Sequence, residues 1–341
     1  MHPRRHGTPD QRPRWRRLGL PKRRCTEVTA LALLLATASC SLWRIATVPY
    51  GKEVTAVRSL ETLQQRLEAA DAASVNLLLT DIGRIEYPGF ASVFWRMVYR
   101  PFAPGLKRVL IVSGVRGNEA AGVACALERI DQLRAAPGPG RLFNADILPM
   151  MNPWGWTHGL ARNQEKHDIG QDFGSFLSRE ARIVRRFLRG KRYDLVVELS
   201  EDAEASGFYI RPYGPETTTV CERIVAEIRS LGYPIEIRTG ELWRASQGGI
   251  LATGRWHLAL KEWAGTLSFP GYARRQVSSA VYTVVTPAIL PLADRIAMQR
   301  AALDALIAAH ASPPGPPAAG APPNEPEAPC YRLSPVKKSR S

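Results

Sequence analysis

The sequence has few residues of the kinds that bind transition metals. Its five cysteines form no CxxC pair and no other spacing typical of a metal site. Only six of its 341 residues are histidines, and none lies between His167 and His257. Aspartate and glutamate are absent between Glu262 and Asp294. The cysteine spacing excludes a zinc cluster built from cysteines. The segment between His167 and His257 offers no histidine ligand, and the segment between Glu262 and Asp294 offers no carboxylate ligand.

Acidic residues are also in the minority. The chain has 46 Lys and Arg against 31 Asp and Glu, a formal net charge of +15. Much of the excess lies in the first 40 residues, and no helical segment carries a basic stripe interleaved with aromatics. We therefore expect no nucleic-acid partner. With 45% hydrophobic residues, the remainder can bury a full core.

The N-terminal segment is typical of an export signal. Residues 1–24 are basic, and residues 28–39 are apolar but too short to span a bilayer. Small residues then precede Cys40, as in a bacterial lipobox, which makes Cys40 a candidate lipidation site. An uncleaved anchor and an ordinary cleaved signal are the alternatives. All three predict export to the cell envelope or periplasm, and we favour attachment to a membrane through the lipid or the anchor.

The composition predicts three parts: a leader at 1–40, an α/β domain at 50–311, and a Pro-rich disordered tail at 312–341. Apolar runs predict strands at 73–85, 107–115, 145–151, 193–199 and 280–287. Helical periodicity predicts helices at 53–70, 120–133, 175–188, 217–231 and 291–309. Residues 233–262 show little periodicity. This alternation predicts a single α/β domain with a mixed, mainly parallel central sheet flanked by helices.

The predicted strand at 107–115 leads into a loop and a helix. Gly114 and Gly117 can turn the backbone, and Asn118 can cap a helix that begins at Ala120. In open α/β sheets such a joint lies at the carboxyl end of the strands, where ligands bind.

This joint resembles the first metal motif of the zinc carboxypeptidases and their succinylglutamate desuccinylase-like relatives. That motif reads His-Gly-x-Glu, and its His and Glu bind zinc. Here Arg116 stands at the His position and Glu119 at the Glu position. Ser200 stands where the family has its third ligand, a His. Val285 occupies the position of the Glu that activates the zinc-bound water.

A second match follows the predicted strand at 145–151. Residues 152–155, Asn-Pro-Trp-Gly, resemble the family's Asn-Pro-x-Gly segment, and Arg162, Asn163 and Asp168 follow with similar spacing. Gly170 and Gln171 stand where the family has an Asn-Arg pair that binds the terminal carboxylate of the substrate. The resemblance makes Arg162, Asn163 and Gln171 the candidate ligand-binding residues.

The resemblance implies the family fold without its chemistry. Of the three ligand positions only Glu119 holds a ligand type, so we expect no bound metal, no cofactor and no catalytic residue. Without zinc, Glu119 and Asp168 are two partly buried carboxylates that need a partner. We therefore predict a structural ion-pair cluster of Arg116, Glu119 and Asp168. The alternative is that Arg116 points to solvent.

The expected function is that of a non-catalytic, zinc-carboxypeptidase-like protein. It would bind a peptide, an amino-acyl ligand or a partner in the inherited cleft. The alternative is an active metallo-hydrolase, a carboxypeptidase or N-acyl amino acid amidohydrolase, with zinc held at a rearranged site of Glu119, His158 and His167. A third interpretation is a structural envelope lipoprotein with a filled cleft. The oligomeric state stays open.

Overall fold

The computed structural model of the chain describes residues 58–101, 105–134, 143–214, 218–237, 248–253 and 255–311. All of them belong to one compact unit, Thr55–Ser341. The predicted leader, Cys40 and the predicted tail at 312–341 lie outside the described residues. In the described ranges, no helix combines the length and the apolar character that a bilayer crossing requires.

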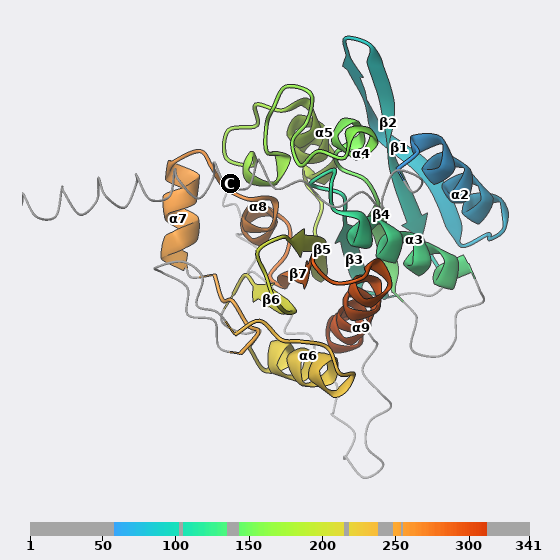
Figure 1. Cartoon of the computed structure of the whole chain (residues 1–341). Helices are drawn as coiled ribbons and strands as arrows, with labels where there is room; N and C mark the ends of the chain where they lie inside the picture. Colours follow the sequence, from blue (N-terminus) through green and yellow to red (C-terminus); the bar gives the residue numbers. More distant parts are fainter. Residues whose placement is uncertain are drawn as a thin grey trace, which may run out of the picture. The chain divides into compact units, whose positions relative to one another are not determined.

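Within these ranges, seven strands form one mixed sheet in the order β1-β2-β4-β3-β5-β7-β6 (Figure 1). The strands are β1 (Leu77–Tyr87), β2 (Phe90–Tyr99), β3 (Arg108–Val112), β4 (Asn144–Leu148), β5 (Leu195–Asp202), β6 (Tyr209–Pro212) and β7 (Val281–Pro287). The four central strands, β4, β3, β5 and β7, run parallel to one another. β1, β2 and β6 are joined to them in antiparallel pairs. The predicted fold class is confirmed.

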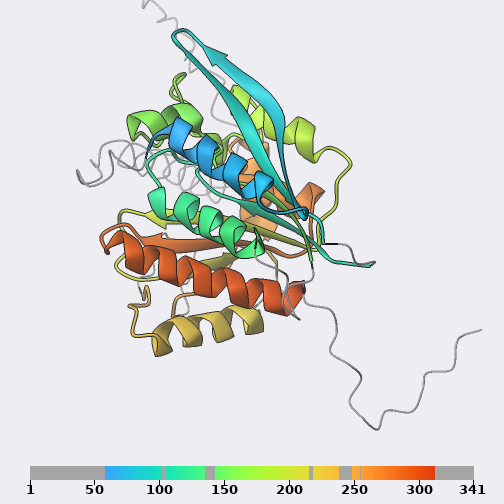
Figure 2. The same ribbon diagram turned by 90° about the vertical axis from the view of Figure 1, so that its right-hand side faces the viewer.

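Helices cover both faces of this sheet. The described helices are α2 (Leu60–Ala72), α3 (Ala120–Arg134), α4 (Pro153–His158), α5 (Arg179–Leu188), α6 (Thr218–Ser230), α7 (Arg255–Trp263), α8 (Phe269–Gln276) and α9 (Leu292–His310). Figure 2 looks onto the layer of α2, α3, α9 and α6. α5 and α8 lie over the opposite face and share a core cluster with the inward side chains of β3 and β7. The central strands are therefore buried on both sides, as parallel strands usually are.

The β1–β2 hairpin extends the sheet beyond the predicted strands. Its strands are paired from Leu77 with Tyr99 to Tyr87 with Phe90, so Pro88 and Gly89 form a two-residue turn. Gly89 has φ 75°, which only glycine adopts readily. The sequence signals the turn but not β2, because that strand lacks a regular apolar alternation.

An ion-pair network fixes β2 against β4. Asp146 on β4 is fully buried and lies 2.7 Å from both Arg96 and Arg100, and it accepts a hydrogen bond from Tyr193. Burial opposes ionisation of this carboxyl, but the bond from Tyr193 and the two guanidinium groups together lower its pKa. The buried carboxylate of Asp146 thus stabilises the pairing of β2 with β4, which joins the hairpin to the parallel strands.

Two elements correct the sequence-based expectations. Residues 233–262, predicted to lack periodic structure, contain α7, and α8 follows at 269–276. α5 begins at Arg179 rather than at residue 175, because Asp172 accepts hydrogen bonds from the backbone N–H groups of Leu177 and Ser178 and holds them in a turn. Ser178 then caps the helix by accepting from the N–H of Ala181.

Candidate functional site

The residues singled out in the sequence come together at the carboxyl ends of the parallel strands. Arg116 and Glu119 follow β3, Asp168 lies in the segment after β4, Ser200 is on β5 and Val285 is on β7. This is the edge at which open α/β sheets bind ligands.

Two glycines shape the loop that carries Arg116. Gly114 has φ 62°, a left-handed conformation in which a side chain is strained. At Gly117 a Cβ atom would lie 2.0 Å from the carbonyl carbon of Gly155 and 2.3 Å from the backbone nitrogen of Trp156. The loop after β3 therefore packs backbone to backbone against α4, which fixes the position of Arg116.

Arg116 lies between two carboxylates. Its Nη1 is 3.3 Å from Glu119 Oε1, and its Nη2 is 3.7 Å from Asp168 Oδ2. Ser200 Oγ donates a hydrogen bond of 3.0 Å to the same Glu119 oxygen. The Glu119 side chain is 1% exposed, whereas that of Arg116 is 25% exposed. The structure thus brings the three predicted cluster residues together, adds Ser200 to them, and leaves part of the Arg116 side chain exposed.

The electrostatics of this cluster favour a permanent cation. The neighbouring carboxylates, Asp168 foremost, raise the pKa of Arg116. Burial raises the pKa of Glu119 to about 8, and the nearby Glu201 and Glu198 act in the same direction. Burial also raises the pKa of Glu198, which accepts a hydrogen bond of 2.8 Å from Thr283 Oγ1.

The start of α3 is capped from a distant strand. The N–H of Ala121 donates to Glu201 Oε1 at 2.5 Å, and the other oxygen of Glu201 lies 2.6 Å from Arg295 on α9. Asn118, the predicted cap, makes no such bond; its Oδ1 is buried without a partner. A carboxylate suits this place, because the helix N-terminus carries exposed N–H donors and a partial positive charge. The predicted cap at Asn118 is therefore wrong.

Several polar atoms around Arg116 are buried and unsatisfied. Within the described part of the chain, Arg116 Nε, Asn118 Oδ1, Glu119 Oε2 and Asp168 Oδ1 have no hydrogen-bond partner. Buried polar groups are usually paired, so each such atom calls for an explanation. The ion-pair cluster and the neighbouring Asn118 thus contain one nitrogen donor and three oxygens without a hydrogen-bond partner.

The position of the family's general base is apolar. Val285 pairs with Ser200 across β5 and β7 and is 3% exposed. It forms a small apolar cluster with Ala205, Tyr209 and Leu251. This cluster leaves no carboxylate to activate a water molecule at that position.

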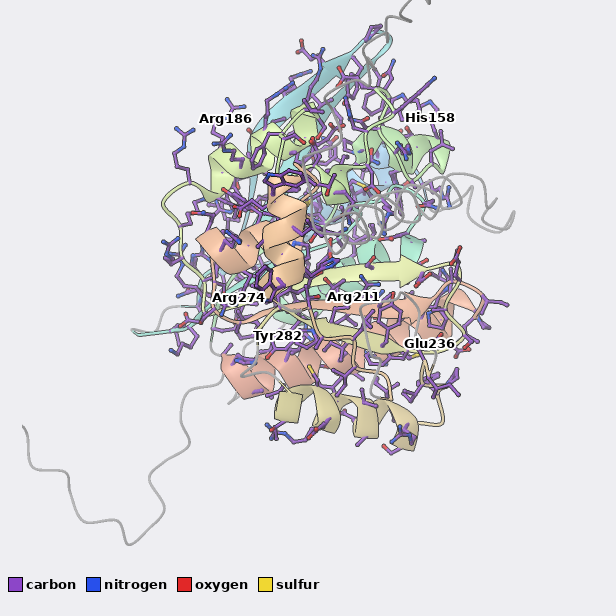
Figure 3. The ribbon with its side chains drawn as sticks, turned by 90° about the vertical axis from the view of Figure 1, so that its left-hand side faces the viewer. His158, Arg186, Arg211, Glu236, Arg274 and Tyr282 are labelled. Carbon is purple, nitrogen blue, oxygen red and sulfur yellow. The ribbon has the colours of Figure 1, made fainter. Side chains whose placement is uncertain are left out.

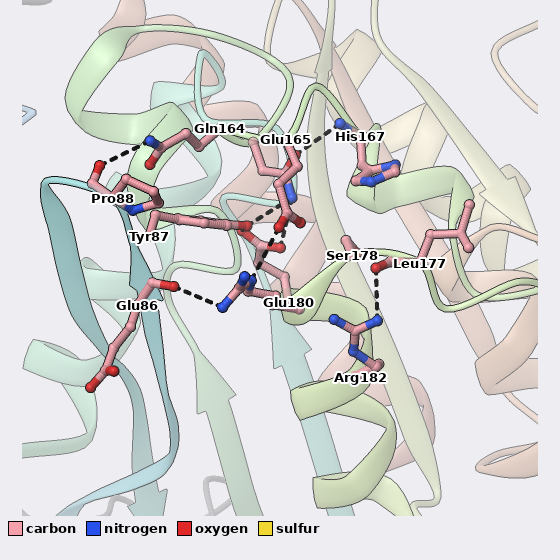
Figure 4. Close-up of polar contacts among 12 residues, drawn as sticks. Glu86, Tyr87, Pro88, Gln164, Glu165, His167, Leu177, Ser178, Glu180 and Arg182 are labelled. Carbon is pink, nitrogen blue, oxygen red and sulfur yellow. Dashed lines mark hydrogen bonds and ion pairs between the residues drawn. The ribbon is translucent and has the colours of Figure 1, made fainter.

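The three candidate ligand-binding residues lie in different surroundings, and Asn163 is the most buried of them. Asn163 is 1% exposed, and its amide donates to Tyr87 Oη at 3.0 Å and to Glu180 Oε2 at 2.8 Å. Its Oδ1 accepts from the N–H of His167. With these bonds it keeps no exposed donor for a ligand. Figure 4 shows Tyr87 and Glu180 in this network, which ties the loop before Asp168 to the β1–β2 hairpin and to α5.

Arg162 and Gln171 are more accessible. Arg162 Nη1 donates to the carbonyl of Lys166 within its own loop. Gln171 Oε1 accepts a hydrogen bond of 3.0 Å from Lys261 Nζ on α7. Lys261 therefore brings a cation to the position where the resemblance replaces Arg by Gln. Sequence inspection offers no sign of this contact, because 90 residues separate the two side chains.

His158, one of the two histidines of the rearranged-site alternative, has its ring engaged locally. The ring of His158 stacks on Trp154 at 4.1 Å, and its Nδ1 lies 2.8 Å from the carbonyl oxygen of Trp154. Among the described residues, no group of three or more His, Cys, Asp or Glu is arranged to hold a metal ion. Glu119, His158 and His167 form no such group.

Comparisons with solved structures show which known proteins share this architecture. A candidate metallopeptidase from Shewanella amazonensis superposes with a TM-score of 0.61 at 19% identity, covering 74% of this chain and 94% of that one. A metallo-carboxypeptidase from Burkholderia cenocepacia gives 0.56 at 15% identity, over 74% and 69%. Carboxypeptidase A from Helicoverpa armigera gives 0.53 at 14% identity, over 74% and 71%. The chain has a zinc-carboxypeptidase-like fold.

At these identities the similarity extends to the fold alone. No protein-family model matches the sequence, and no curated protein matches it. The zinc-carboxypeptidase-like fold implies a zinc ion, and the residues present can be tested against it. Zinc needs nitrogen, sulfur or carboxylate ligands. Here a guanidinium and a hydroxyl, Arg116 and Ser200, accompany Glu119, and the guanidinium cannot lose its proton in a protein. These residues do not fit the metal.

Proposed function

We propose that this chain is a non-catalytic protein of zinc-carboxypeptidase-like fold, exported and held at the cell envelope. It binds a peptide or an amino-acyl ligand at the carboxyl edge of its sheet. The observation that carries the proposal is the position of Arg116, whose guanidinium lies 3.3 Å from Glu119 and 3.7 Å from Asp168. A fixed cation at that place repels a metal ion and joins the two carboxylates that would otherwise be unpaired.

Hydrolysis needs groups that these positions do not supply. Val285 cannot take a proton from water, and Ser200 donates its hydroxyl to Glu119. Neither the activation of a water molecule nor the stabilisation of an oxyanion by a metal is then available at this edge. We therefore expect no hydrolysis.

The unsatisfied atoms support a binding role. Arg116 Nε is a donor, and Asn118 Oδ1, Glu119 Oε2 and Asp168 Oδ1 are oxygens. A peptide or amino-acyl group carries both carbonyl acceptors and N–H donors, so it can complement this set. Lys261, beside Gln171, adds a cation suited to a terminal carboxylate.

The proposal is tested first by elemental analysis of the purified full chain after dialysis. We expect zinc far below one equivalent and no hydrolysis of N-benzoyl-Gly-Phe. A zinc content close to one equivalent, with hydrolysis that a chelator abolishes, would overturn the proposal in favour of a rearranged metal site.

The binding role is tested with N-acetyl tripeptides. A mixture with free carboxylates and the same mixture as C-terminal amides are compared by equilibrium dialysis and mass spectrometry. We expect the free acids to be retained preferentially, and Lys261→Met to remove that preference. Arg300→Met, which changes an exposed basic residue on α9, is the matched control. Equal retention of acids and amides would contradict a carboxylate-binding role.

A further inference from the structure

An exposed apolar stripe runs along α7. Trp256 is 90% exposed, Leu260 51% and Trp263 80%. Their spacing of four and three residues places them on one side of the helix. On the other side Leu258 is 7% exposed and belongs to the core cluster that also holds Leu267. The helix is thus fixed to the domain by one face and presents two tryptophans and a leucine on the other.

Such a stripe differs from ordinary surface exposure. Single exposed apolar residues are normal, but large apolar side chains gathered on one face mark an interaction site. Trp256 and Trp263 are also the two most exposed tryptophans that the structure describes. Tryptophan prefers places that are apolar on one side and wet on the other.

The neighbouring elements are strongly basic. Exposed arginines line α5 and the turn after it: Arg182, Arg185, Arg186, Arg189 and Arg192. Figure 3 faces this side of the molecule and labels Arg186 of α5 and Arg274 of α8. In α5, α7 and α8 as described, Glu262 is the one exposed carboxylate, and it pairs with Arg275.

Side-chain contacts join these elements into one surface. The guanidinium of Arg185 lies 4.3 Å from the ring of Phe176, which packs edge to face on Tyr272 of α8. Arg192 donates to the carbonyl of Gln276 at the end of α8. The ion pair of Glu262 with Arg275 connects α8 to α7. α8 thus connects the arginine rim of α5 to the tryptophan stripe of α7, and the exposed side chains of these three helices are here called the α7 face.

We propose that the α7 face docks onto an anionic lipid surface. Trp256, Leu260 and Trp263 enter the interfacial region of the bilayer, and the arginines of α5 contact lipid phosphates. This combination of aromatic and aliphatic residues with cations is the one that holds amphipathic helices in the interface plane. A second copy of the chain is a poorer occupant, because two α7 faces would bring the same positive charges together. The inference is independent of the proposed ligand-binding role.

The test uses the full chain and a readout local to α7. Backbone hydrogen exchange is followed by mass spectrometry with vesicles of phosphatidylcholine alone and with vesicles of equal parts phosphatidylcholine and phosphatidylglycerol. We expect the anionic vesicles to slow exchange severalfold across residues 255–263 and high salt to reverse the effect. Because the readout is local, attachment through the N-terminal segment does not mimic it.

Paired variants separate the contributions. Trp256→Ala with Trp263→Ala removes the stripe, and Arg182→Gln with Arg186→Gln weakens the rim; each pair is expected to abolish most of the slowing. Leu231→Ala with Ile289→Ala, at exposed apolar positions on other elements, is the matched control and keeps it. Exchange at 255–263 that vesicles leave unchanged overturns the proposal. Slowing that requires high protein concentration and no lipid also overturns it and assigns the face to a second copy.

Discussion

At position 116 a guanidinium occupies a place between two carboxylates, and its identity decides which chemistry is available there. A neutral His nitrogen can bind a metal, whereas a guanidinium keeps its proton and its charge. The Arg116 side chain is 25% exposed, so it is part of the accessible edge and also a partner for buried Glu119. One residue thus brings a cation to this place and pairs with the carboxylates on either side of it.

The first prediction concerns this ion-pair cluster. Arg116→Met keeps most of the side-chain volume but leaves Glu119 and Asp168 without their cation. Loss of one partner of a fully buried pair costs about 3–5 kcal/mol, and the exposure of Arg116 reduces the expected loss to about 1–3 kcal/mol. Urea unfolding at pH 9, above the pKa of about 8 that burial gives Glu119, measures it with both carboxylates ionised. Arg84→Met, which breaks an exposed pair with Glu86, serves as control and should change the free energy of unfolding little. Equal effects of the two substitutions would argue against the cluster.

The second prediction concerns the pH dependence that Glu119 causes. Its pKa is raised to about 8 in the folded state by burial, from an ordinary value of 4.5. Between those values the folded state holds a proton that the unfolded state releases. Stability therefore falls as pH rises through this window, by about 1.4 kcal/mol per pH unit for one group, and levels off above it.

Glu119→Gln removes that titration. As pH rises from 5 to 8, the free energy of unfolding of the wild type should fall relative to that of the variant. Denaturant titrations at each pH measure the difference, with the exposed Glu86→Gln as control. Wild type and variant curves that stay parallel over this range would show that Glu119 is ionised throughout.

At the scale of elements, the loop before Asp168 is held by a buried polar network. Asn163 joins Tyr87 at the end of β1 to Glu180 in the first turn of α5, and it fixes the backbone at His167. Burial raises the pKa of Glu180, although the hydrogen bonds from Tyr87 and Asn163 oppose the shift. The network thus positions the segment that presents Asp168 to Arg116.

The third prediction tests this anchoring. Asn163→Leu leaves the buried Glu180 carboxyl with one donor fewer, and we expect a loss of about 2–3 kcal/mol in the free energy of unfolding. Gln164→Leu is the control, because the neighbouring Gln164 is partly exposed and donates only to the carbonyl of Pro88. It should lower the free energy of unfolding by less than about 1 kcal/mol, the usual contribution of one exposed hydrogen bond. Hydrogen exchange should also increase in residues 160–168 of the Asn163 variant alone. Unchanged exchange there would contradict the anchoring role.

Some of these elements could be predicted from the sequence, and others could not. β3, the first half of β5 and most of β7 are rich in apolar β-branched residues, so their positions follow from the sequence pattern. α7 carries one core residue, Leu258, between outward tryptophans, and this pattern hides its periodicity. The cap that Glu201 provides to α3 depends on β5 lying against the start of that helix, 80 residues away along the chain. Local patterns predict strands and helices, whereas contacts of this kind depend on the completed sheet.

At the scale of the whole molecule, a zinc-carboxypeptidase-like sheet brings a guanidinium, a hydroxyl and an apolar side chain together at its carboxyl edge. Ser200 and Val285 are adjacent on β5 and β7, and Arg116 reaches the same edge from the loop after β3. Arg116 and Ser200 both contact Glu119, whereas Val285 packs in an apolar cluster with Ala205, Tyr209 and Leu251. We therefore expect the stability of the core to be independent of a metal ion.

The last prediction follows from this independence. A ligand that binds the native state stabilises it, so removal of a bound metal lowers the unfolding temperature. We expect a chelator to leave the unfolding temperature of the wild type unchanged. In Arg116→His with Ser200→His, residues 116, 119 and 200 would offer two imidazoles and a carboxylate, and added zinc should raise stability by about 2.7 kcal/mol at a hundredfold excess over its dissociation constant. Differential scanning calorimetry measures both. A wild-type transition that a chelator lowers and zinc restores would mean that the native fold holds a metal, whereas a zinc-insensitive double variant would mean that the three positions do not converge.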